Sequence, residues 1–419
     1  MTEHEQAIHF DKNDPLAHKI AAFYLPKNMV YLDGNSLGPL PLEAKQRAFD
    51  VVQAQWGETL IESWNKHQWI DLPLTVGNKI APLIGAQPNS VICCDSISVN
   101  LFKVLSAAML MQREQSPNKK LILSQEDNFP TDLYMAQGLS QLMGQEKCEL
   151  LSVSSDDVVN TLNQRGSEIA ILMLTHVNFK NGHVFDMAGI TQAAHQNNVL
   201  VLWDLAHSAG VMPLALAQHK VDFAVGCTYK YLNGGPGAPA FVYVAPRHLT
   251  ALKQPLSGWM GHKKPFEFTH DYEKAAGIEQ LLSGTPSVIS MSVLDAALNL
   301  FDDITVSDIR KKSIALNAFF QECVEPLIQQ QLLTLACDDD AKNRGSQISF
   351  THEHAYAICQ ALIGQKIVAD FRAPNVLRIG FSPLFLSFTN VYTAANVLID
   401  IVQNARYLAP EYQVKHKVT

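Results

Sequence analysis

The sequence contains little charge and no segment typical of proteins that bind nucleic acid or cross membranes. Only 17% of the 419 residues are charged, and 32 lysines and arginines face 40 aspartates and glutamates, a formal net charge of −8. It has no basic block of the kind that nucleic acid or an anionic membrane requires, and no apolar run long enough to span a bilayer. We therefore expect neither partner.

Cysteine is also scarce, and a secretion signal is missing from the opening residues. The seven cysteines are an odd number spread over a long chain, which favours reduced thiols over a disulfide framework. For the adjacent Cys93 and Cys94, burial in a strand is favoured over a redox pair. Residues 1–5 lack a basic n-region and an apolar h-region. We expect a cytoplasmic enzyme.

The apolar content, 47%, is ample for a large core, and the apolar residues fall into short runs separated by helical patterns. This alternation predicts an α/β fold with a mostly parallel sheet, right-handed crossovers and ligands at the carboxyl ends of the strands. The direction of the last strand stays open. Strands are expected at residues 91–94, 121–123, 150–153, 169–174, 199–203, 221–227 and 240–244.

The pattern changes after residue 288, which predicts a separate α+β domain. We expect an N-terminal arm and helix at 1–60, with a helical pattern over 42–57, that pack with this smaller domain. A large domain is expected at 61–290 and the small domain at 291–419. The small domain is expected to contain helices at 288–301, 306–331, 352–363 and 388–407, and strands near 333, 347–351 and 377–381.

An acid and an amine fall at the ends of two neighbouring predicted strands. Asp204 follows the run 199–203, and Lys230 follows the run 221–227 just before a glycine-rich turn. A strand-end lysine and carboxylate are what a pyridoxal phosphate enzyme needs: the lysine forms the Schiff base and the carboxylate keeps the pyridine nitrogen protonated. His207 is placed to hold that carboxylate or to cover the ring. The alternative is that Asp204 caps a helix and Lys230 is merely solvated.

Three longer motifs carry a resemblance to a known family. They are YLDGNSLG at 31–38, WDLAHSAG at 203–210 and CTYKYLNGGPG at 227–237. They resemble the kynureninases, and the likeness extends from about residue 31 to the C-terminus. It implies a homodimeric pyridoxal 5'-phosphate enzyme of the aspartate aminotransferase fold (fold type I), with a seven-stranded sheet. It further implies hydrolysis of L-kynurenine to anthranilate and L-alanine in tryptophan catabolism.

The resemblance assigns cofactor roles to residues around these motifs. Tyr229, next to the lysine, is the candidate proton donor. The tetrapeptide 129–132 is implied to form a cofactor wall, although a buried staple and cap would explain it without a ligand. An almost uniformly apolar helix is expected at about residues 99–111, and the serines that open it are simple caps or part of a phosphate site. The implied cofactor-binding residues are Ile97, Ser98, Phe129, Pro130, Thr131, Asp132, Thr175, Asp204, His207, Tyr229, Lys230, Trp259 and Thr285.

Substrate roles are implied for Ser36, Trp64 and Arg378. Arg378 lies inside an apolar strand pattern, and a buried arginine there favours a bidentate anion, which the resemblance identifies as the substrate α-carboxylate. Trp259 and Thr285 are implied to reach the phosphate of the neighbouring subunit. Animal enzymes that prefer 3-hydroxykynurenine have asparagine at the position of Thr285, so we expect unsubstituted kynurenine to be preferred.

Other functions remain as alternatives. Another fold type I lyase or aminotransferase is the nearest, because the fold does not decide the chemistry. A cysteine desulfurase needs a reactive thiolate, and Cys337 lies in an acidic stretch that opposes one. A silent binding protein would not need both Asp204 and Lys230. A dehydrogenase would need a Gly-x-Gly-x-x-Gly turn, and a metal site is not expected from His176 and His183.

Overall fold

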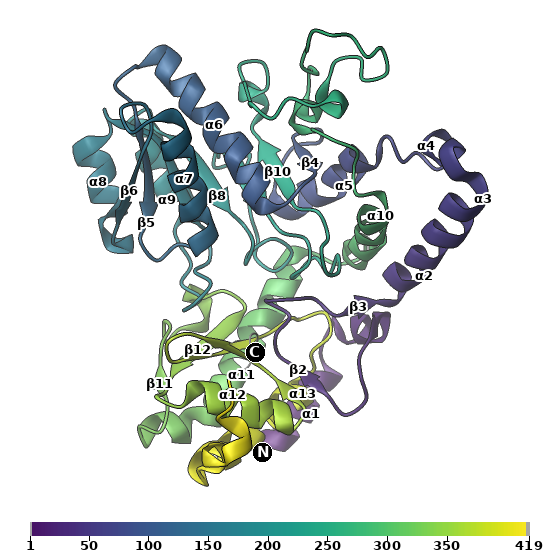
Figure 1. Ribbon diagram of the computed structural model, residues 1–419. Helices are drawn as coiled ribbons and strands as arrows, with labels where there is room; N and C mark the ends of the chain where they lie inside the picture. Colours follow the sequence, from purple (N-terminus) through teal and green to yellow (C-terminus); the bar gives the residue numbers. More distant parts are fainter. Residues whose placement is uncertain (1, 416–419) are drawn as a thin grey trace.

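A seven-stranded sheet forms the centre of the larger lobe in the computed structural model, which describes residues 2–415 (Figure 1). Five neighbouring strands are parallel, and β10 is antiparallel to both of its neighbours, which answers the question that the sequence left open. The predicted α/β class is confirmed. The order is β4 (Val91–Cys93), β10 (Phe241–Val244), β9 (Phe223–Gly226), β8 (Leu200–Asp204), β7 (Ile169–Thr175), β5 (Leu121–Gln125) and β6 (Glu149–Val153).

Helices cover both faces of this sheet, so strands such as β5 and β7 are buried along their whole length. That double burial explains why these strands read as continuous apolar runs rather than as alternating patterns. One face carries α6 (Ile97–Gln115) and α7 (Pro130–Met143). The other carries α5 (Leu72–Ile80), α8 (Val158–Arg165), α9 (Met187–Gln196) and α10 (Val288–Ala297).

Helix α6 is longer than the sequence predicted, and one of its buried side chains is charged. The expected helix covered about residues 99–111, whereas the structure extends it from Ile97 to Gln115. Lys103 within it is fully buried, and its Nζ lies 2.6 Å from Asp95 Oδ2. The buried charge of Lys103 is therefore tolerated in this helix, because Asp95 in the loop before the helix supplies its counter-ion.

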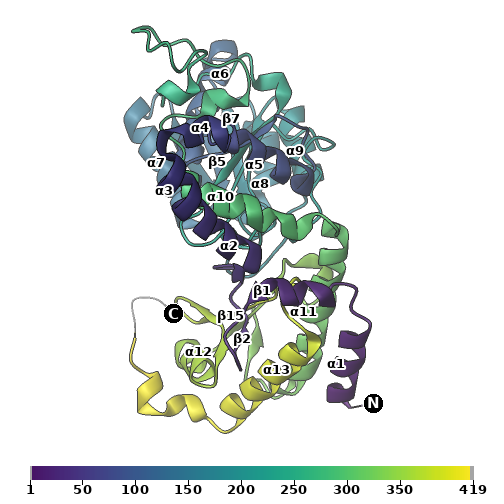
Figure 2. The same ribbon diagram turned by 90° about the vertical axis from the view of Figure 1, so that its right-hand side faces the viewer.

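The smaller lobe is an antiparallel four-stranded sheet with helices on it (Figure 2). Its strand order is β11 (Thr334–Leu335), β12 (Gln347–Thr351), β15 (Val376–Gly380) and β14 (Asp370–Arg372). Strand β14 was not predicted from the sequence. The helices are α11 (Val306–Gln329), α12 (Ala355–Gly364) and α13 (Phe388–Gln403), close to the expected ranges.

The N-terminal segment contacts both lobes. Helix α1 (Glu3–Lys12) packs against α13, and β2 (Val30–Tyr31) pairs in parallel with β13 (Ile367–Val368) of the smaller lobe. The strands β1 (Phe23–Tyr24) and β3 (Leu40–Pro41) pair with each other. The domain boundaries near residues 60 and 290 stay a prediction.

A long helical arm then runs from the smaller lobe along the larger one (Figures 1 and 2). It consists of α2 (Leu42–Asp50), a π-helical turn (Val51–Trp56) and α3 (Gly57–Thr59), followed by α4 (Ser63–Lys66). Helix α2 packs against α10. The sequence predicted one regular helix over 42–57, so the π-helical turn is a departure. Among the residues described, no helix is both long and apolar enough to cross a membrane.

Candidate active site

A cavity of about 240 Å³ lies at the carboxyl edge of the large sheet. Thr175 ends β7 and Asp204 ends β8 directly beside it, since the two residues are paired in the strand register. Lys230 follows β9, the next strand. The parallel sheet therefore brings these three side chains together, as the sequence predicted. Ten predicted cofactor residues line the cavity: Ile97, Ser98, Phe129, Thr131, Asp132, Thr175, Asp204, His207, Tyr229 and Lys230.

Lys230 and His207 form the central polar contact of this cavity, with 2.9 Å between Lys230 Nζ and His207 Nε2. Burial lowers the pKa of Lys230, and burial together with the charge of Lys230 lowers the pKa of His207 well below its usual range. A neutral imidazole can accept from the lysine through Nε2, which leaves its proton on Nδ1. His207 thus contacts the lysine rather than holding the Asp204 carboxylate. The lowered pKa favours an amine able to attack an aldehyde.

Asp204 and Asp132 are two buried carboxyl groups within one cavity. Asp204 Oδ1 accepts a hydrogen bond from the backbone N–H of Ala206 at 2.8 Å. Burial raises the pKa of both groups, and the charge of Asp204 raises the pKa of Asp132 further. Because two like charges are costly here, Asp132 is the group that keeps its proton. A side-chain hydrogen bond to Asp204 also raises the pKa of Asp132, and apart from this neighbouring carboxyl the oxygens of Asp132 have no partner within residues 2–415.

These buried carboxyl groups fit the pyridine end of pyridoxal phosphate. A buried carboxylate is stabilised when a cationic ring nitrogen comes within contact of it. The lysine amine lines the same cavity. We therefore find that the residues present are compatible with this cofactor.

The start of α6 supplies the opposite end of the cavity. Ser96 is the N-cap, its Oγ accepting from Val99 N at 3.4 Å, and Ser96, Ile97 and Ser98 all line the cavity. A helix N-terminus presents free amide groups and the positive end of the helix dipole, which together favour a phosphate. The helix start in this cavity therefore suits the phosphate of the cofactor.

Phe129 lies at the mouth of the cavity, immediately before α7, and is 42% exposed. Its ring meets Phe179 edge to face, with 5.3 Å between centroids and 87° between the planes. Phe179 also lines the cavity, but sequence analysis missed it. It lies in an irregular loop after β7 without a motif, so its only signal is an aromatic residue shortly after a strand end.

Ser36 and Arg378 come from opposite ends of the chain and meet beside this cavity. Arg378 in β15 is buried, and its Nη2 donates to Ser36 Oγ at 2.9 Å. Its Nη1 donates to the backbone carbonyl of Phe179, which lines the cavity. Asp370 of β14 also forms an ion pair with Arg378. The structure thus joins the two predicted substrate residues next to Lys230.

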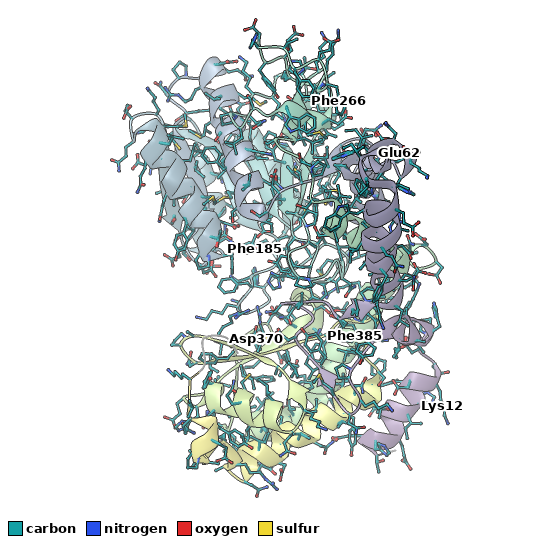
Figure 3. All side chains as sticks on the ribbon, turned by 45° about the vertical axis from the view of Figure 1, so that its right-hand side comes forward. Lys12, Glu62, Phe185, Phe266, Asp370 and Phe385 are labelled. Atoms are coloured by element: carbon teal, nitrogen blue, oxygen red, sulfur yellow. The ribbon has the colours of Figure 1, made fainter. Side chains whose placement is uncertain are left out.

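Six predicted site residues do not line the cavity: Ser36 and Arg378, which meet beside it, and Pro130, Trp64, Trp259 and Thr285. Pro130 is the first residue of α7. Trp64 packs edge to face on Trp69, with 6.0 Å between centroids. Trp259 packs against Phe266 and Phe268 on a segment that projects from the larger lobe, where Figure 3 labels Phe266. Their site roles stay predictions.

Cys337, the residue considered for desulfurase chemistry, lies outside the cavity. It is half-buried in the smaller lobe, where Arg344 Nη1 donates to its Sγ at 3.4 Å. Within residues 2–415 no group of three His, Cys, Asp or Glu side chains is arranged to hold a metal ion.

Comparisons with known proteins find relatives along the whole chain. A family model described as the kynureninase C-terminal domain matches residues 309–398. A kynureninase of Burkholderia mallei (strain ATCC 23344) is 44% identical over 420 residues, covering 100% of both chains. A kynureninase of Pseudomonas fluorescens is 42% identical over 419 residues, again covering 100% of both.

Solved structures show the fold alone, because their sequence identities are low. A mutant of the enzyme C-DES with glycine covalently linked to its pyridoxal phosphate superimposes with a TM-score of 0.77 and 18% identity, covering 91% of this chain and 98% of that one. An apo cysteine desulfurase from Thermococcus onnurineus NA1 also has a TM-score of 0.77, with 17% identity and coverages of 93% and 98%.

Proposed function

Because this chain belongs to the kynureninase family, we propose that Lys230, Asp204 and Tyr229 are the catalytic groups of the family's reaction. The chain is a pyridoxal phosphate-dependent hydrolase of carbon–carbon bonds. It splits the Cβ–Cγ bond of L-kynurenine, which yields anthranilate and L-alanine. The observation that carries the residue assignment is the meeting of Lys230 and Asp204 in one closed cavity at the strand ends.

When bound, pyridoxal phosphate supplies an aldehyde for amines and a protonated ring that withdraws electrons from the substrate Cα. Asp204 holds the proton on the ring nitrogen, and the neutral Asp132 beside it leaves Asp204 as the charged member of the pair. Lys230 removes the proton from Cα, for which an amine with a lowered pKa is suited at neutral pH. His207 orients that amine through the contact between their nitrogens.

Tyr229 is the proton donor in this proposal. The neighbouring Cys227 raises the pKa of Tyr229, and burial raises it further, so the phenol keeps its proton at neutral pH. A hydroxyl that stays protonated can give its proton to a carbon or oxygen that becomes basic during cleavage. Lys230 Nζ lies 6.0 Å from the centroid of the Tyr229 ring, so the proposed donor and base are close to each other in the cavity.

Arg378 and Ser36 bind the substrate α-carboxylate. A buried guanidinium beside the cavity gives a charge-assisted hydrogen bond that fixes the substrate's orientation. Fixing the carboxylate keeps the bonds at Cα aligned with the electron-withdrawing ring, which is a positioning effect. We further propose a preference for unsubstituted kynurenine, supported by threonine at position 285.

A second copy of the chain completes the site in this proposal. Apolar side chains on the helical arm are strongly exposed, including Phe49, Trp56 and Ile61 at 60%, 55% and 77%. Beside them is a cavity of about 640 Å³ lined by Trp56, Trp69 and Ile289 among others. Large exposed apolar patches of this kind mark protein interfaces. The second copy supplies Trp64, Trp259 and Thr285, which do not reach the cavity of their own chain.

A cytoplasmic location is also part of the proposal. All seven cysteines fall within the described residues and are free thiols, as expected for a reducing compartment.

Anthranilate fluorescence is the direct test of this function. The purified holoenzyme is incubated with L-kynurenine and, side by side, with 3-hydroxykynurenine, whose product is followed by chromatography. We expect faster turnover of kynurenine. Borohydride reduction and peptide mapping then locate the modified residue, which we expect to be Lys230. Lys253→Ala, an exposed lysine, is the matched control for Lys230→Ala. A label on another residue would refute the lysine assignment, and absence of anthranilate would refute the function.

A further inference from the structure

Asp370 joins two arginines beside the cavity, of which the reaction described above uses only one. Strand β14 pairs Asp370 directly with Arg378 of β15. Asp370 Oδ2 contacts Nη2 of Arg378 and also Nη2 of Arg372, the latter at 2.9 Å. Asp370 is 2% exposed, so this carboxylate has little access to water. One buried carboxylate oxygen therefore holds two guanidinium groups next to each other.

Ser36 lies at the point where the two guanidinium groups meet. Its Oγ is 2.9 Å from Nη2 of Arg378, 3.4 Å from Nη2 of Arg372 and 3.3 Å from Asp370 Oδ2. The turn that carries Ser36 is also tied to the catalytic strand end, since Gly38 N donates to the carbonyl of Tyr229 at 2.7 Å. The two arginines are thus connected, through the turn at residues 36–38, to the backbone of the residue before Lys230.

The charges of both arginines act on the groups in the cavity. After burial, which is the largest effect, Arg378 and Arg372 each contribute to lowering the pKa of Lys230 and of His207. Arg372 is therefore close enough to influence the reacting groups, although it does not line the cavity. Both guanidinium groups are potential donors of charge-assisted hydrogen bonds to an anionic group on the substrate.

While Arg378 keeps its present contacts, it cannot donate two parallel hydrogen bonds to one carboxylate. Both paired edges of a guanidinium include Nη2, and in Arg378 this nitrogen already donates to Asp370 and Ser36. Within the described residues its Nε is buried and without a partner, so it can serve one carboxylate oxygen. The second oxygen then needs a donor from another residue.

A second acid, Asp33, also faces the cluster. Burial and the charge of Asp370 raise the pKa of Asp33 to about 6, against the opposing effects of Ser36 and the two arginines. At neutral pH the positive charges of the two arginines are balanced by the negative charges of the two acids. A bound substrate carboxylate adds one negative charge and so raises the pKa of Asp33 further. Loss of one arginine would leave the carboxylate facing an excess of negative charge, which makes binding sensitive to Arg372.

We propose that Arg372 is a second substrate-binding arginine of the carboxylate subsite, and that Asp370 is a positioning residue that holds Arg372 and Arg378 together over Ser36. This inference rests on the proposed function, because the anion is the α-carboxylate of kynurenine. Arg372 receives the carboxylate oxygen that Arg378 leaves unpaired. Asp370 acts through the arginines and does not touch the substrate.

The test compares two ligands of the holoenzyme that differ in the carboxylate. L-Kynurenine carries it, and kynuramine, the decarboxylated analogue used as a competitive inhibitor, lacks it. We expect Arg372→Gln to raise the KM for kynurenine about 10- to 100-fold, as for loss of a charge-assisted hydrogen bond, with a smaller change in kcat. The Ki of kynuramine should change less than about threefold. Arg372→Lys, which keeps the charge, should recover part of the loss.

Three further variants make the result decisive. Arg406→Gln, an exposed arginine of the same lobe paired with Asp400, is the control and should leave both constants unchanged. Asp370→Asn should raise the KM for kynurenine and not the Ki of kynuramine. Adding Arg372→Gln to Asp370→Asn should raise the KM by a smaller factor than Arg372→Gln does in the wild type. An unchanged KM in Arg372→Gln, or equal rises of KM and Ki, would overturn the inference.

Arg378→Gln separates this inference from the proposed function. If Arg378→Gln raises the KM for kynurenine and Arg372→Gln does not, the subsite stands with one arginine and only the inference fails. If neither variant changes the KM while the wild type makes anthranilate, the proposed carboxylate subsite itself fails, and the role of Arg372 fails with it.

Discussion

Lys230 Nζ and His207 Nε2 are 2.9 Å apart in a buried cavity where the pKa of each group is lowered. The neutral imidazole accepts from the lysine, so it fixes the direction of the catalytic amine. His207→Leu removes this acceptor and should lower kcat/KM about 10- to 100-fold, because a misplaced catalytic group loses much of its rate. His207→Gln keeps an acceptor and should retain more activity. Steady-state kinetics on cofactor-saturated protein measures both, and equal losses would contradict the orienting role.

Gly38 permits the close approach of the N-terminal turn to the strand end of Lys230. A Cβ at this position would lie 2.4 Å from the Lys230 carbonyl oxygen and 2.9 Å from Asn233 Cα, both of them backbone atoms. Gly38→Ala should therefore displace the lysine and lower kcat at least about tenfold. Gly138→Ala is the control, since its Cβ meets nothing within 4 Å in helix α7 and should stabilise the fold slightly. Similar kinetics for the two variants would argue against this packing.

Much of the large lobe could be predicted because its strands carry a strong local signal. The runs that became β7 and β8 are apolar throughout, and their ends placed Thr175 and Asp204 on one edge. β14 could not be predicted, since Asp370–Arg372 is short and two of its three residues are charged, and it is formed only by pairing with β15. Asp370 and Arg372 were missed for the same reason. The π-helical turn Val51–Trp56 likewise has no distinct sequence pattern.

The cavity contains the predicted residues that lie at strand ends and helix starts, such as Ile97 and Lys230. Trp64 and Trp259 do not line it, because each lies on a segment that projects from its own lobe and packs on other aromatic rings. The resemblance implies that Trp259 acts in the neighbouring subunit, and this role stays a prediction.

Mixing two inactive variants tests whether sites are shared between subunits. Lys230→Ala removes the amine, and Trp259→Ala removes the proposed contribution to the neighbouring site. If sites are shared, a mixed dimer has one intact site, made from Lys230 of one chain and Trp259 of the other. After equal mixing and exchange, activity should recover to about a quarter of the wild-type value, since half of the dimers are mixed. No recovery, with exchange verified by differently tagged chains, would mean that each chain builds its own site.

Asp222 should make the large lobe sensitive to acid, far from the catalytic edge. It is 2% exposed, and its carboxylate is contacted by His195 at 2.8 Å, by His248 at 2.7 Å and by Arg247 at 2.6 Å. Burial alone would raise the pKa of Asp222, but the hydrogen bonds from both histidines and the charge of Arg247 outweigh burial and lower this pKa well below its usual range. A lowered pKa in the folded state stabilises the protein at pH values above the pKa of the unfolded chain, near about 4.

Asp222→Asn should therefore reduce the free energy of unfolding by about 2 kcal/mol at pH 6, because Arg247 and the two histidines lose the buried carboxylate to which they hydrogen-bond. The difference in unfolding free energy between wild type and variant should shrink as the pH falls below about 4. In that range the unfolded chain binds a proton at Asp222 that the folded chain does not yet bind. Urea unfolding of the holoenzyme at pH 6, 5 and 3.5 measures this gap. Asp271→Asn, at an exposed acid, is the control and should show a small effect at every pH. A gap that stays constant down to pH 3.5 would show that the pairing of Asp222 contributes no pH-dependent stability.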